Sequence, residues 1–461
     1  MGCRTKKADG ITIAYIGGGS RDWAWNLMRD LALEEQLEGV VRLYDIDLEA
    51  AEHNAVIGNR LAEDPAARAK WEYRVARSLR EALTGADFVV ISILPGTFDE
   101  MQSDVHAPEK YGIYQSVGDT VGPGGSIRAL RTIPMFVTIA EAIRQYAPSA
   151  WVINFTNPMS ICIKTLYHVF PGIRAFGCCH AVFHAQELLS SMLRDNGYGD
   201  ATRKDICCVV TGVNHFTWFT KASYQGMDLF PAFADFARKY AQTGYDRDGS
   251  QAWKTNPFEC AHRVLFDLFL RYGAIPAAED RHTSEFVPWY LKDPETVRGW
   301  MFGLTSVAWR KQDLAARLAR GEALRSGRER LELVPSGEEG HLMIKALLGL
   351  GDMVTNVNLP NVGQVSNLPL GAVVETNALF TANGVAPVFA GELPHGVLSL
   401  VYPHALNQFT LLDAVLRQDA ELAFHAFMNE PLMRLEPSDA RALFQEMLRN
   451  TAKYLPEGLL S

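Results

Sequence analysis

Ile11-Thr-Ile-Ala-Tyr-Ile16, followed at once by Gly17-Gly-Gly-Ser20, is the most informative segment of this chain for its fold. The mostly apolar run predicts a buried parallel strand, and the glycines after it predict a tight turn. Apolar residues then recur at helical spacing from Trp23 to Leu33. A strand, a glycine-rich turn and a helix in this order bring a helix N-terminus close to a dinucleotide pyrophosphate.

Two further predicted strands extend this pattern toward an NAD site. Val40 to Tyr44 is followed by Asp45, at the place where such folds hold the ribose hydroxyls of NAD. Ala86 to Ile93 is a third strand, and the turn after it passes beside the cofactor. The expected cofactor-binding residues are Gly17, Gly19, Ser20, Asp45, Pro95 and Gly96. Because Asp22 stands where a third glycine is usual, a plain strand–turn–helix is the alternative.

The composition indicates a soluble α/β enzyme that acts on small molecules. The 461 residues are 48% hydrophobic and 21% charged, with a net charge of −9 and no basic block of the kind that nucleic-acid binders use. Seven scattered cysteines, with two adjacent pairs that make poor disulfide partners, favour a reducing cytoplasm. Met1 to Gly10 is polar and no apolar run is long enough for a bilayer, so we expect neither signal peptide nor membrane anchor.

A glycine-rich loop from Tyr114 to Gly125 carries a single acid, Asp119. A helix is expected to begin near Ser126 and to carry Arg128 and Arg131. Loops of this kind usually present binding and catalytic groups. Asp119 is therefore a candidate catalytic residue, with capping of the turn as the alternative.

Two amides lie at the C-terminal end of another predicted strand, Trp151 to Phe155. Asn154 and Asn157 lie at its C-terminal end, where open α/β sheets bind their ligands. We therefore expect both to contact the substrate. A turn built by Asn157-Pro158 is the simpler interpretation.

A cysteine and a histidine end two apolar runs, Phe176 to His180 and Thr211 to His215. The thiolate of Cys179 and the imidazole of His215 can share a divalent metal and leave open positions for substrate oxygens. Alternatively, Cys178 and Cys179 are small buried hydrophobes and His215 is a core histidine. These residues alone leave both interpretations open.

In this order, the segments resemble family 4 glycoside hydrolases, which are NAD- and metal-dependent glycosidases. Each motif is weak by itself, but the ordered set is specific and covers nearly the whole chain. The motifs are Gly17-Gly-Gly-Ser20, Val117-Gly-Asp-Thr-Val-Gly-Pro-Gly-Gly125, Asn154-Phe-Thr-Asn-Pro158, Cys179-His180, Gly212-Val-Asn-His215 and Pro276-Ala-Ala-Glu-Asp-Arg-His282. The family is an exception to the two-carboxylate scheme of glycosidases.

The resemblance implies an α/β fold in two parts. Residues 1–200 are expected to form a Rossmann-like, doubly wound parallel sheet that binds NAD. Residues 201–461 are expected to form an α+β lobe of the lactate and malate dehydrogenase type, which binds substrate and metal and joins subunits into a homodimer or homotetramer. Val374-Glu-Thr-Asn377 departs from the family's Val-Glu-Val-Pro, which leaves the subunit contacts open.

The implied reaction is an elimination assisted by redox chemistry. A hydride passes from C3 of the sugar to NAD⁺, a base removes the C2 proton, the glycosidic oxygen leaves, water adds at C1 and the hydride returns. The resemblance places a divalent metal, expected to be Mn²⁺, on Cys179 and His215, although a thiolate favours softer metals. His180 would face the reacting hydroxyls, and Asp119 would assist departure of the leaving group.

The remaining roles concern the sugar and the base. The residues expected to bind the sugar are Asn154, Asn157, Arg281 and His282. Asp280 is the candidate base at C2. Glu279 and Tyr272 are the alternatives, because phosphoglycosidases of the family use a tyrosine in this region.

The sugar is expected to be a hexuronic acid such as galacturonic or glucuronic acid. Ala181-Val182 after the Cys-His pair matches neither galacturonidases nor galactosidases, but the surrounding motifs are closer to the galacturonidases. A uronate carboxylate needs a cationic clamp, for which Arg128, Arg131 and Arg281 are available. The alternatives are an α-galactosidase or α-glucosidase of the same family, an NAD-dependent hydroxyacid or polyol dehydrogenase, and a non-catalytic NAD-binding protein.

Overall fold

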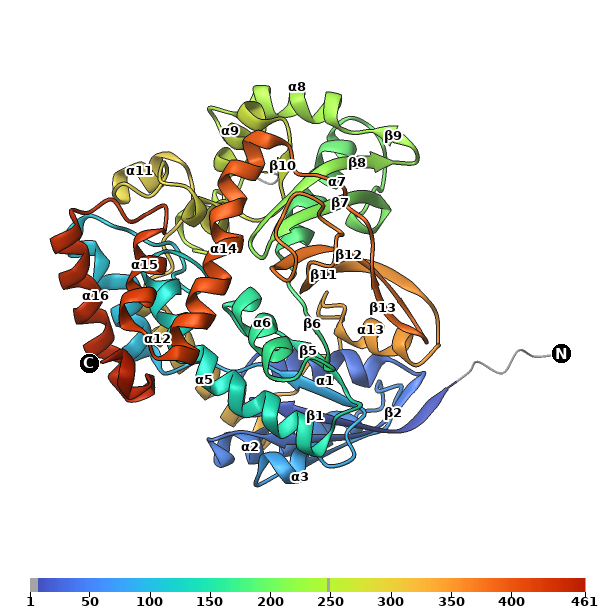
Figure 1. Cartoon of the computed structure of the whole chain (residues 1–461). Helices are drawn as coiled ribbons and strands as arrows, with labels where there is room; N and C mark the ends of the chain where they lie inside the picture. The colour runs from blue at the N-terminus through green and yellow to red at the C-terminus, as the bar shows by residue number, and fades with distance from the viewer. Residues whose placement is uncertain (1–6, 247–248, 461) are drawn as a thin grey trace.

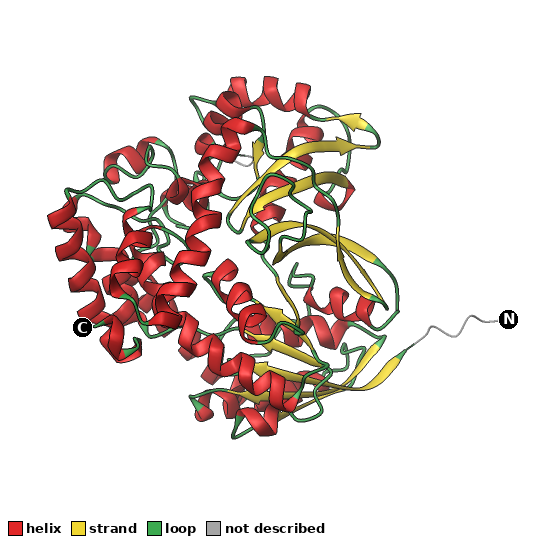
Figure 2. Cartoon of the chain, in the orientation of Figure 1, coloured by secondary structure: helices red, strands yellow, loops and turns green. Residues whose placement is uncertain are grey.

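The computed structural model describes residues 7–246 and 249–460 and contains two β-sheets surrounded by helices. In Figure 1 the larger sheet extends from the bottom, where β1 lies, to the centre, where β11 and β12 lie, and the smaller one, with β7 (Ile206–Val213) and β8 (Phe216–Tyr224), lies toward the top. The long helix α14 (His395–Arg417) runs between these two regions and the C-terminal helices on the left. Figure 2 shows that helices cover the larger sheet, as expected for an α/β fold.

The larger sheet contains the predicted dinucleotide-binding topology. Its nine strands lie in the order β13 (Gly384–Pro387), β12 (Val373–Thr381), β11 (Met353–Pro360), β6 (Arg174–Gly177), β5 (Trp151–Asn154), β4 (Phe88–Ile91), β1 (Ala8–Ile16), β2 (Leu37–Tyr44) and β3 (Trp71–Val75). The six strands from β6 to β3 pair in parallel. Their order reverses between β1 and β4, and ligands bind at such a switch point.

Helices pack on both faces of this sheet. One face contacts α1 (Trp23–Leu33), α2 (Leu48–Ala62) and α13 (Gly340–Leu347), and the other contacts α3 (Leu79–Leu83), α5 (Gly122–Tyr146) and α6 (Met159–Val169). α1 spans the predicted residues, but α5 begins at Gly122, before the expected Ser126. The reason is tertiary: the buried carboxylate of Glu430 accepts a hydrogen bond from the Gly122 N–H at 2.8 Å and so caps the helix.

Three strands from late in the chain complete the larger sheet. β11, β12 and β13 pair antiparallel, and β11 adjoins β6 where Asn358 faces Gly177. Residues 353–387 therefore extend the sheet that the sequence analysis assigned to residues 1–200. The division into two domains near residue 200 stays a prediction.

The smaller sheet presents the tip of a hairpin. It also contains β9 (Met227–Asp228) and β10 (Ile275–Pro276), and it packs against α7 (Ala181–Asp195), α8 (Phe230–Tyr240) and α9 (Arg263–Tyr272). β7 and β8 pair from end to end, and Asn214-His215 forms the turn between them. This geometry carries His215 away from the sheet toward the C-terminal helices.

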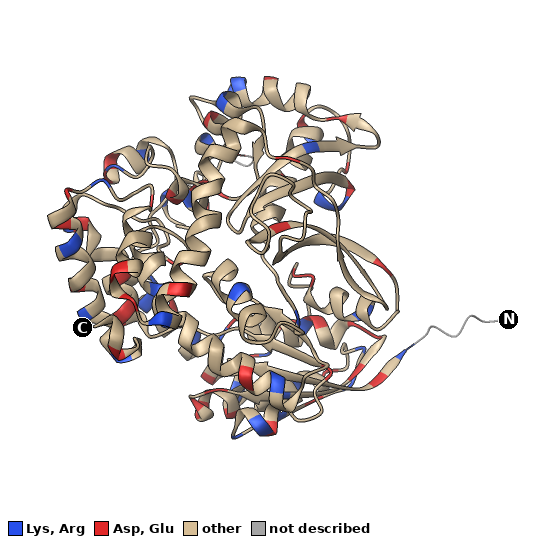
Figure 3. Ribbon diagram, in the orientation of Figure 1, with Lys and Arg blue, Asp and Glu red and all other residues tan. Residues whose placement is uncertain are grey.

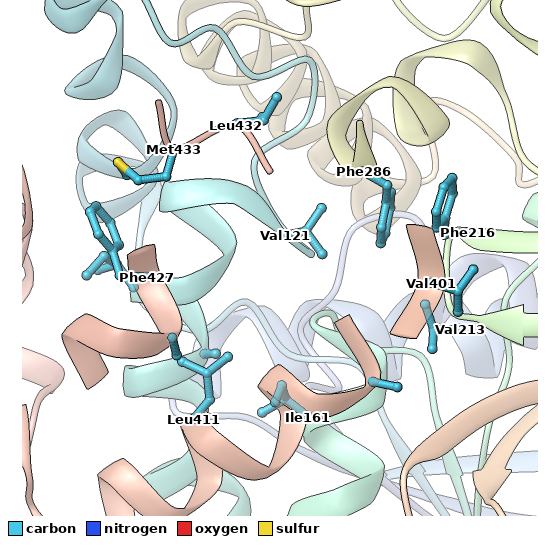
Figure 4. Close-up of a cluster of buried hydrophobic side chains, with 14 of the residues drawn as sticks. Val121, Ile161, Val213, Phe216, Phe286, Val401, Leu411, Phe427, Leu432 and Met433 are labelled. Carbon is cyan, nitrogen blue, oxygen red and sulfur yellow. The ribbon is translucent and has the colours of Figure 1, made fainter. Parts of the chain in front are cut away.

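The largest apolar core fixes that hairpin tip. It joins the hairpin to α14, to α15 (Ala420–Met428) and to α16 (Pro437–Thr451). Figure 4 shows Phe216 beside Phe286, and their rings stack with centroids 4.6 Å apart. Val213 and Phe216, on either side of the turn, are both buried in this core. Close packing of this kind holds His215 in one place.

Charged side chains of both signs are scattered over the ribbon in Figure 3. α14 is an exception, because it carries no Lys, Arg, Asp or Glu between His395 and Leu412. Within residues 7–246 and 249–460, none of the helices combines the length and the apolar character needed to cross a membrane.

Candidate active site

The glycine-rich turn after β1 lies against the ends of the neighbouring strands. Gly17 has a φ of 93°, and a Cβ there would lie 1.9 Å from the Ser92 carbonyl oxygen, so glycine is required. The Gly19 N–H donates to Asp45 Oδ2 at 2.8 Å. The Asp45 carboxylate is thus held beside the turn, at the sheet edge where ligands bind.

Asn54 on α2, which the sequence analysis did not single out, holds this turn from behind. Its side-chain amide donates to the carbonyl oxygens of Gly18 (2.8 Å) and Ser20 (2.9 Å), and its Oδ1 accepts from Trp25 Nε1 at 2.9 Å. The turn leads into α1, whose N-terminal N–H groups have no side-chain cap. Uncapped N–H groups at this position suit a pyrophosphate.

The same sheet edge presents apolar side chains that could cover the adenine ring of a dinucleotide. Ile46 is 95% exposed and Leu94 is 43% exposed; they follow β2 and β4, the strands on either side of β1. Gly96, with a φ of 90°, continues this edge, and the Pro95 carbonyl accepts a hydrogen bond from Arg131 Nε at 2.9 Å. The predicted cofactor residues therefore surround one switch point, and their chemistry fits NAD.

A group of metal-ligating side chains lies at the tip of the β7–β8 hairpin. His215 has a φ of 62°, a left-handed conformation that in residues other than glycine is concentrated at functional sites. Ligand atoms of Asp119, His215 and His282 lie within 4.8 Å of one another, the only such group of His, Cys, Asp or Glu among the described residues. Thr120 Oγ1 donates to Asp119 (2.9 Å) and lies 2.8 Å from His215 Nδ1, which leaves His215 Nε2 free for a metal.

The charges of this group suit a divalent cation. Burial lowers the pKa values of His215 and His282, so both imidazoles are neutral at neutral pH. Burial alone would raise the pKa of Asp119, but the charges of Arg128 and Arg310, together with those of the two histidines in their protonated form at low pH, outweigh it and lower that pKa. One carboxylate and two imidazoles are a donor set that Mn²⁺ accepts.

Cys179, the expected second metal ligand, is not a member of this group. Its thiol lies beside the side chain of Asn214, which hydrogen-bonds to it, so it is close to the hairpin tip. Burial and the charge of Glu375 raise the pKa of the thiol well above its usual value. The thiol therefore keeps its proton unless a bound cation displaces it.

The structure argues against the prediction that Asp280 is the C2 base. Asp280 is fully buried, and its two carboxylate oxygens accept hydrogen bonds from the N–H groups of Val264 (3.1 Å) and Leu265 (3.0 Å). Burial raises the pKa of Asp280 to about 7. Because both oxygens already stabilise the first turn of α9, neither is available to a sugar.

Of the two alternatives, Glu279 faces the polar group. Tyr272 packs among apolar rings, with centroids 6.1 Å from Trp218 and 6.4 Å from Trp289. One oxygen of Glu279 lies 2.9 Å from His184 Nε2, and the other, Oε2, is buried without a partner. Burial would raise the pKa of Glu279, but His184 and its other cationic neighbours hold it well below its usual value. Glu279 is therefore ionised and has a free oxygen.

The prediction that Asn154 binds the sugar also disagrees with the structure. It is fully buried, its amide donates to the Thr156 carbonyl (3.0 Å) and its Oδ1 accepts from the Thr156 N–H (3.1 Å), so it builds the turn after β5. Asn157 differs, because its side-chain Oδ1 is buried without a partner while its carbonyl accepts from Arg128 Nε at 3.1 Å. An unpaired buried amide oxygen is suited to a sugar hydroxyl.

His180 connects this group to the cofactor turn. Its ring stacks on Trp23 at the start of α1, at a centroid distance of 5.9 Å, and its Nδ1 lies 3.0 Å from Glu338 Oε1. Burial would lower the pKa of His180, but Glu338 and Glu279 raise it. His180 is thus placed between the nucleotide end and the histidine group.

The arginines of the region fall into two classes. Arg131 is fully buried in an ion pair with Asp104, and the Nη1–Oδ1 distance is 2.9 Å, so of the three arginines that the sequence offered for a carboxylate, Arg131 already has a partner. Arg281 lies next to His282, with Nη2 3.4 Å from Nε2. Arg310, on α12 (Val307–Ser326), also reaches this region, and no sequence pattern marked it.

Two family models match this chain. The model described as family 4 glycosyl hydrolase matches residues 12–195, and the model of its C-terminal domain matches residues 210–433. The chain belongs to glycosyl hydrolase family 4. This confirms the resemblance seen in the sequence. An α-galacturonidase of Thermoanaerobacterium saccharolyticum is 60% identical over 452 residues, which are 97% of each chain, and one of Bacillus subtilis is 53% identical over 96% of this chain and 97% of its own.

Solved structures share the fold of this chain. The Bacillus subtilis protein lplD, described as a glucosidase, is 53% identical, covers 96% of this chain and 100% of its own, and has a TM-score of 0.92. A 6-phospho-α-glucosidase from gut microorganisms, in complex with NAD and Mn²⁺, is 22% identical over 98% and 99% of the two chains, with a TM-score of 0.77. A lactate dehydrogenase from Eimeria maxima is 14% identical over 89% and 97%, with a TM-score of 0.50. The expected fold class is confirmed.

Proposed function

We propose that this family 4 glycosidase hydrolyses glycosides of a hexuronic acid, α-galacturonides foremost, with NAD⁺ and Mn²⁺. The α-galacturonidases at 53% and 60% identity support the choice of sugar, and the family member solved with NAD and Mn²⁺ supports the cofactors. The observation that carries the proposal is a set of buried polar atoms without partners around the Asp119–His215–His282 group, namely Asn157 Oδ1, Glu279 Oε2, Arg281 Nε, His282 Nδ1 and Glu285 Oε2. Such atoms require a polar ligand.

The proposed metal site centres on His215. When bound, NAD⁺ supplies reversible oxidation at C3 and the metal supplies polarisation of the sugar oxygens. Besides His215, the family pattern offers Cys179, and the geometry offers Asp119 and His282. Because its pKa is lowered, Asp119 is ionised, so we propose it as a metal ligand in place of its expected role at the leaving group.

Electron paramagnetic resonance of Mn²⁺ tests these ligands without turnover. Cys179→Ser and Asp119→Asn each remove one candidate donor. If the replaced residue is a metal ligand, the protein should bind Mn²⁺ about tenfold or more weakly. An unchanged affinity for Mn²⁺ in Asp119→Asn would exclude the Asp119–His215–His282 group as the metal site.

Glu279 is the proposed base at C2. Its free Oε2 would accept the C2 proton, and His184, 2.9 Å from Oε1 and half exposed, would exchange that proton with solvent. Asn157 Oδ1 would accept a hydrogen bond from a sugar hydroxyl. His180 would border the reacting carbon from the nucleotide side.

The decisive test is hydrolysis of 4-nitrophenyl galacturonides, glucuronides, galactosides and glucosides of both anomers in D₂O. We expect release of nitrophenol from an α-galacturonide only with NAD⁺ and Mn²⁺ together, with deuterium at C2 of the product. Net accumulation of NADH would instead show a dehydrogenase. Release that is indifferent to NAD⁺ and metal would exclude the proposed mechanism.

A homodimer or homotetramer in the cytoplasm completes the proposal. The uncharged face of α14 exposes Tyr402 and Leu406, and nearby loops expose Val362, Leu370 and Phe389. Lys164 joins these parts, since it bonds to the Gly371 carbonyl and covers the Phe409 ring. A second copy of the chain is the proposed occupant of this apolar surface. Light scattering of Leu406→Glu should then show a smaller particle than the wild type; an unchanged mass would exclude this surface.

All six described cysteines are free thiols, which fits a reducing compartment.

A further inference from the structure

Two arginines hold the loop that carries Asp119. On one side, Ser116 bonds to the Arg281 carbonyl, and Arg281 Nη1 donates to Thr305 Oγ1 at 3.1 Å. On the other side, Arg310 Nη2 donates to the Val117 carbonyl at 3.4 Å. The charge of Arg310 lies close enough to both Asp119 and Arg281 for each of them to influence its pKa.

These arginines have no carboxylate partner. Among the described residues, neither Arg281 nor Arg310 has a carboxylate oxygen within 4.0 Å, and the Nε atom of each is buried without an acceptor. The same is true of Arg128, which has an unpartnered Nη1. Arg131, by contrast, has its partner in Asp104. Arg128 and Arg281 are buried and Arg310 is half-buried. A guanidinium withdrawn from water without a counterion is unfavourable, so this group of cations suits an anion that the chain itself does not supply.

The nearby acids do not neutralise this charge. Glu285 Oε1 accepts the N–H groups of Val117 (2.8 Å) and Gly118 (2.9 Å), and burial raises the pKa of Glu285 to about 8, so it is mostly protonated at neutral pH. Glu279 pairs with His184. Asp119 and Glu279 are both ionised near the guanidinium groups, but Asp119 shares its position with two histidines and Glu279 is held by His184.

We propose that Arg310, together with Arg281, binds the C6 carboxylate of the sugar and so determines the preference for uronides. The proposal rests on the proposed function and adds the residues that recognise the acid. A planar guanidinium binds a carboxylate through two parallel hydrogen bonds, and the unpartnered Nε atoms supply the donors for this geometry. The ligand has the chemistry of an anion on C6, which a carboxylate or a phosphate can supply.

Substrate preference of Arg310→Gln tests the assignment. We expect kcat/KM for the 4-nitrophenyl galacturonide to fall by about 10²-fold, as for loss of a charged hydrogen bond, while the galactoside changes by less than about threefold. Arg310→Lys should retain an intermediate preference, because it keeps the charge without the planar fork. Lys311→Met is the matched control, since the next residue on α12 pairs with Asp99 at the surface (2.8 Å).

Other outcomes would overturn the inference. If kcat/KM of Arg310→Gln falls equally for the galacturonide and the galactoside, Arg310 only supports the loop through Val117. If galactose 6-phosphate competes better than galacturonate, the arginines recognise phosphate. Should Arg310→Gln fail to fold, competition by galacturonate against galactose in Arg310→Lys and wild type decides, and equal weakening of both sugars excludes the clamp. Failure of the proposed function is separate, because wild-type protein would then not prefer the galacturonide.

Discussion

The cofactor turn and the sugar pocket differ in how their polar groups are satisfied. At the turn, the carbonyls of Gly18 and Ser20 bond to Asn54, and the Gly19 N–H bonds to Asp45. In the pocket, Asn157 and Glu279 each keep a buried oxygen without a partner. The backbone of the turn is therefore held in place before any ligand arrives, whereas the side chains of the pocket reach their full set of hydrogen bonds only with a ligand present.

This difference has a functional meaning. A rigid turn loses little conformational freedom when a nucleotide binds, so it suits a cofactor that stays bound through the reaction. Unpaired groups in the pocket interact with the sugar as its charge distribution changes. Substitutions should therefore separate the two regions, since one region affects nucleotide affinity and the other affects turnover.

The largest effect should come from His215, which belongs to the pocket alone. His215→Asn keeps a residue that tolerates the left-handed conformation but removes the imidazole. Because the metal contributes strongly to catalysis, we expect activity to fall by about 10³-fold or more, with loss of Mn²⁺ binding by paramagnetic resonance and unchanged NAD⁺ affinity by calorimetry. The control is His53→Asn on α2. Intact Mn²⁺ binding in His215→Asn would remove this residue from the metal site.

A second effect distinguishes two adjacent acids. Glu279→Gln should lower kcat by about 10²- to 10⁴-fold and stop deuterium entry at C2, because it removes the base. Asp280→Asn should instead lower the free energy of unfolding by about 1 kcal/mol, because it weakens the cap of α9, and should leave deuterium entry at C2 intact. Exchange that depends on Asp280 and not on Glu279 would reverse the assignment.

A third effect tests the turn itself. Asn54→Ala leaves two buried carbonyls without donors, so we expect a loss of about 1–3 kcal/mol in unfolding free energy and about tenfold weaker NAD⁺ binding. Asn59→Ala is the matched control, since Asn59 lies on the same helix and bonds to the backbone N–H and carbonyl of Tyr73, both at 2.9 Å. It should destabilise the protein without changing NAD⁺ affinity. Equal effects on NAD⁺ in both variants would show only a general loss of stability.

The smallest effect concerns Glu430, which caps α5 beneath the Asp119 loop. Burial raises its pKa from 4.5 to about 7, so the unfolded chain releases this proton first, and the stability it contributes is present below 4.5 and is lost as the pH rises toward 7. Glu430→Gln should therefore melt at a temperature that varies less between about pH 5 and about pH 8, measured by calorimetry. Glu421→Gln is the control: a hydrogen bond from Arg441 lowers the pKa of Glu421 from 4.5, so its contribution is lost only at lower pH, and its removal should leave the trend between about pH 5 and about pH 8 unchanged. An unchanged pH dependence in Glu430→Gln would show that its proton is not coupled to folding.

The sequence by itself determined the local parts of this protein. The apolar strand before Gly17, the helix after it and the acid at Asp45 follow from periodicity and turn chemistry, because neighbouring residues build them. The ordered motifs also identified the family. His215 and His282 could be chosen as polar groups within those motifs, although not as close neighbours.

Tertiary structure alone decided which of these groups meet. Glu279 and Asp280 are adjacent in the chain, but one bonds to His184 and the other to α9, since consecutive residues at the start of a helix point in different directions. Arg131, which the sequence offered for a substrate carboxylate, pairs with Asp104, whereas Arg310, which no sequence pattern marked, reaches the loop of Asp119. Long-range packing sets the direction of such side chains, and no local pattern records a contact between residues more than 150 positions apart, such as Ser116 and Arg281.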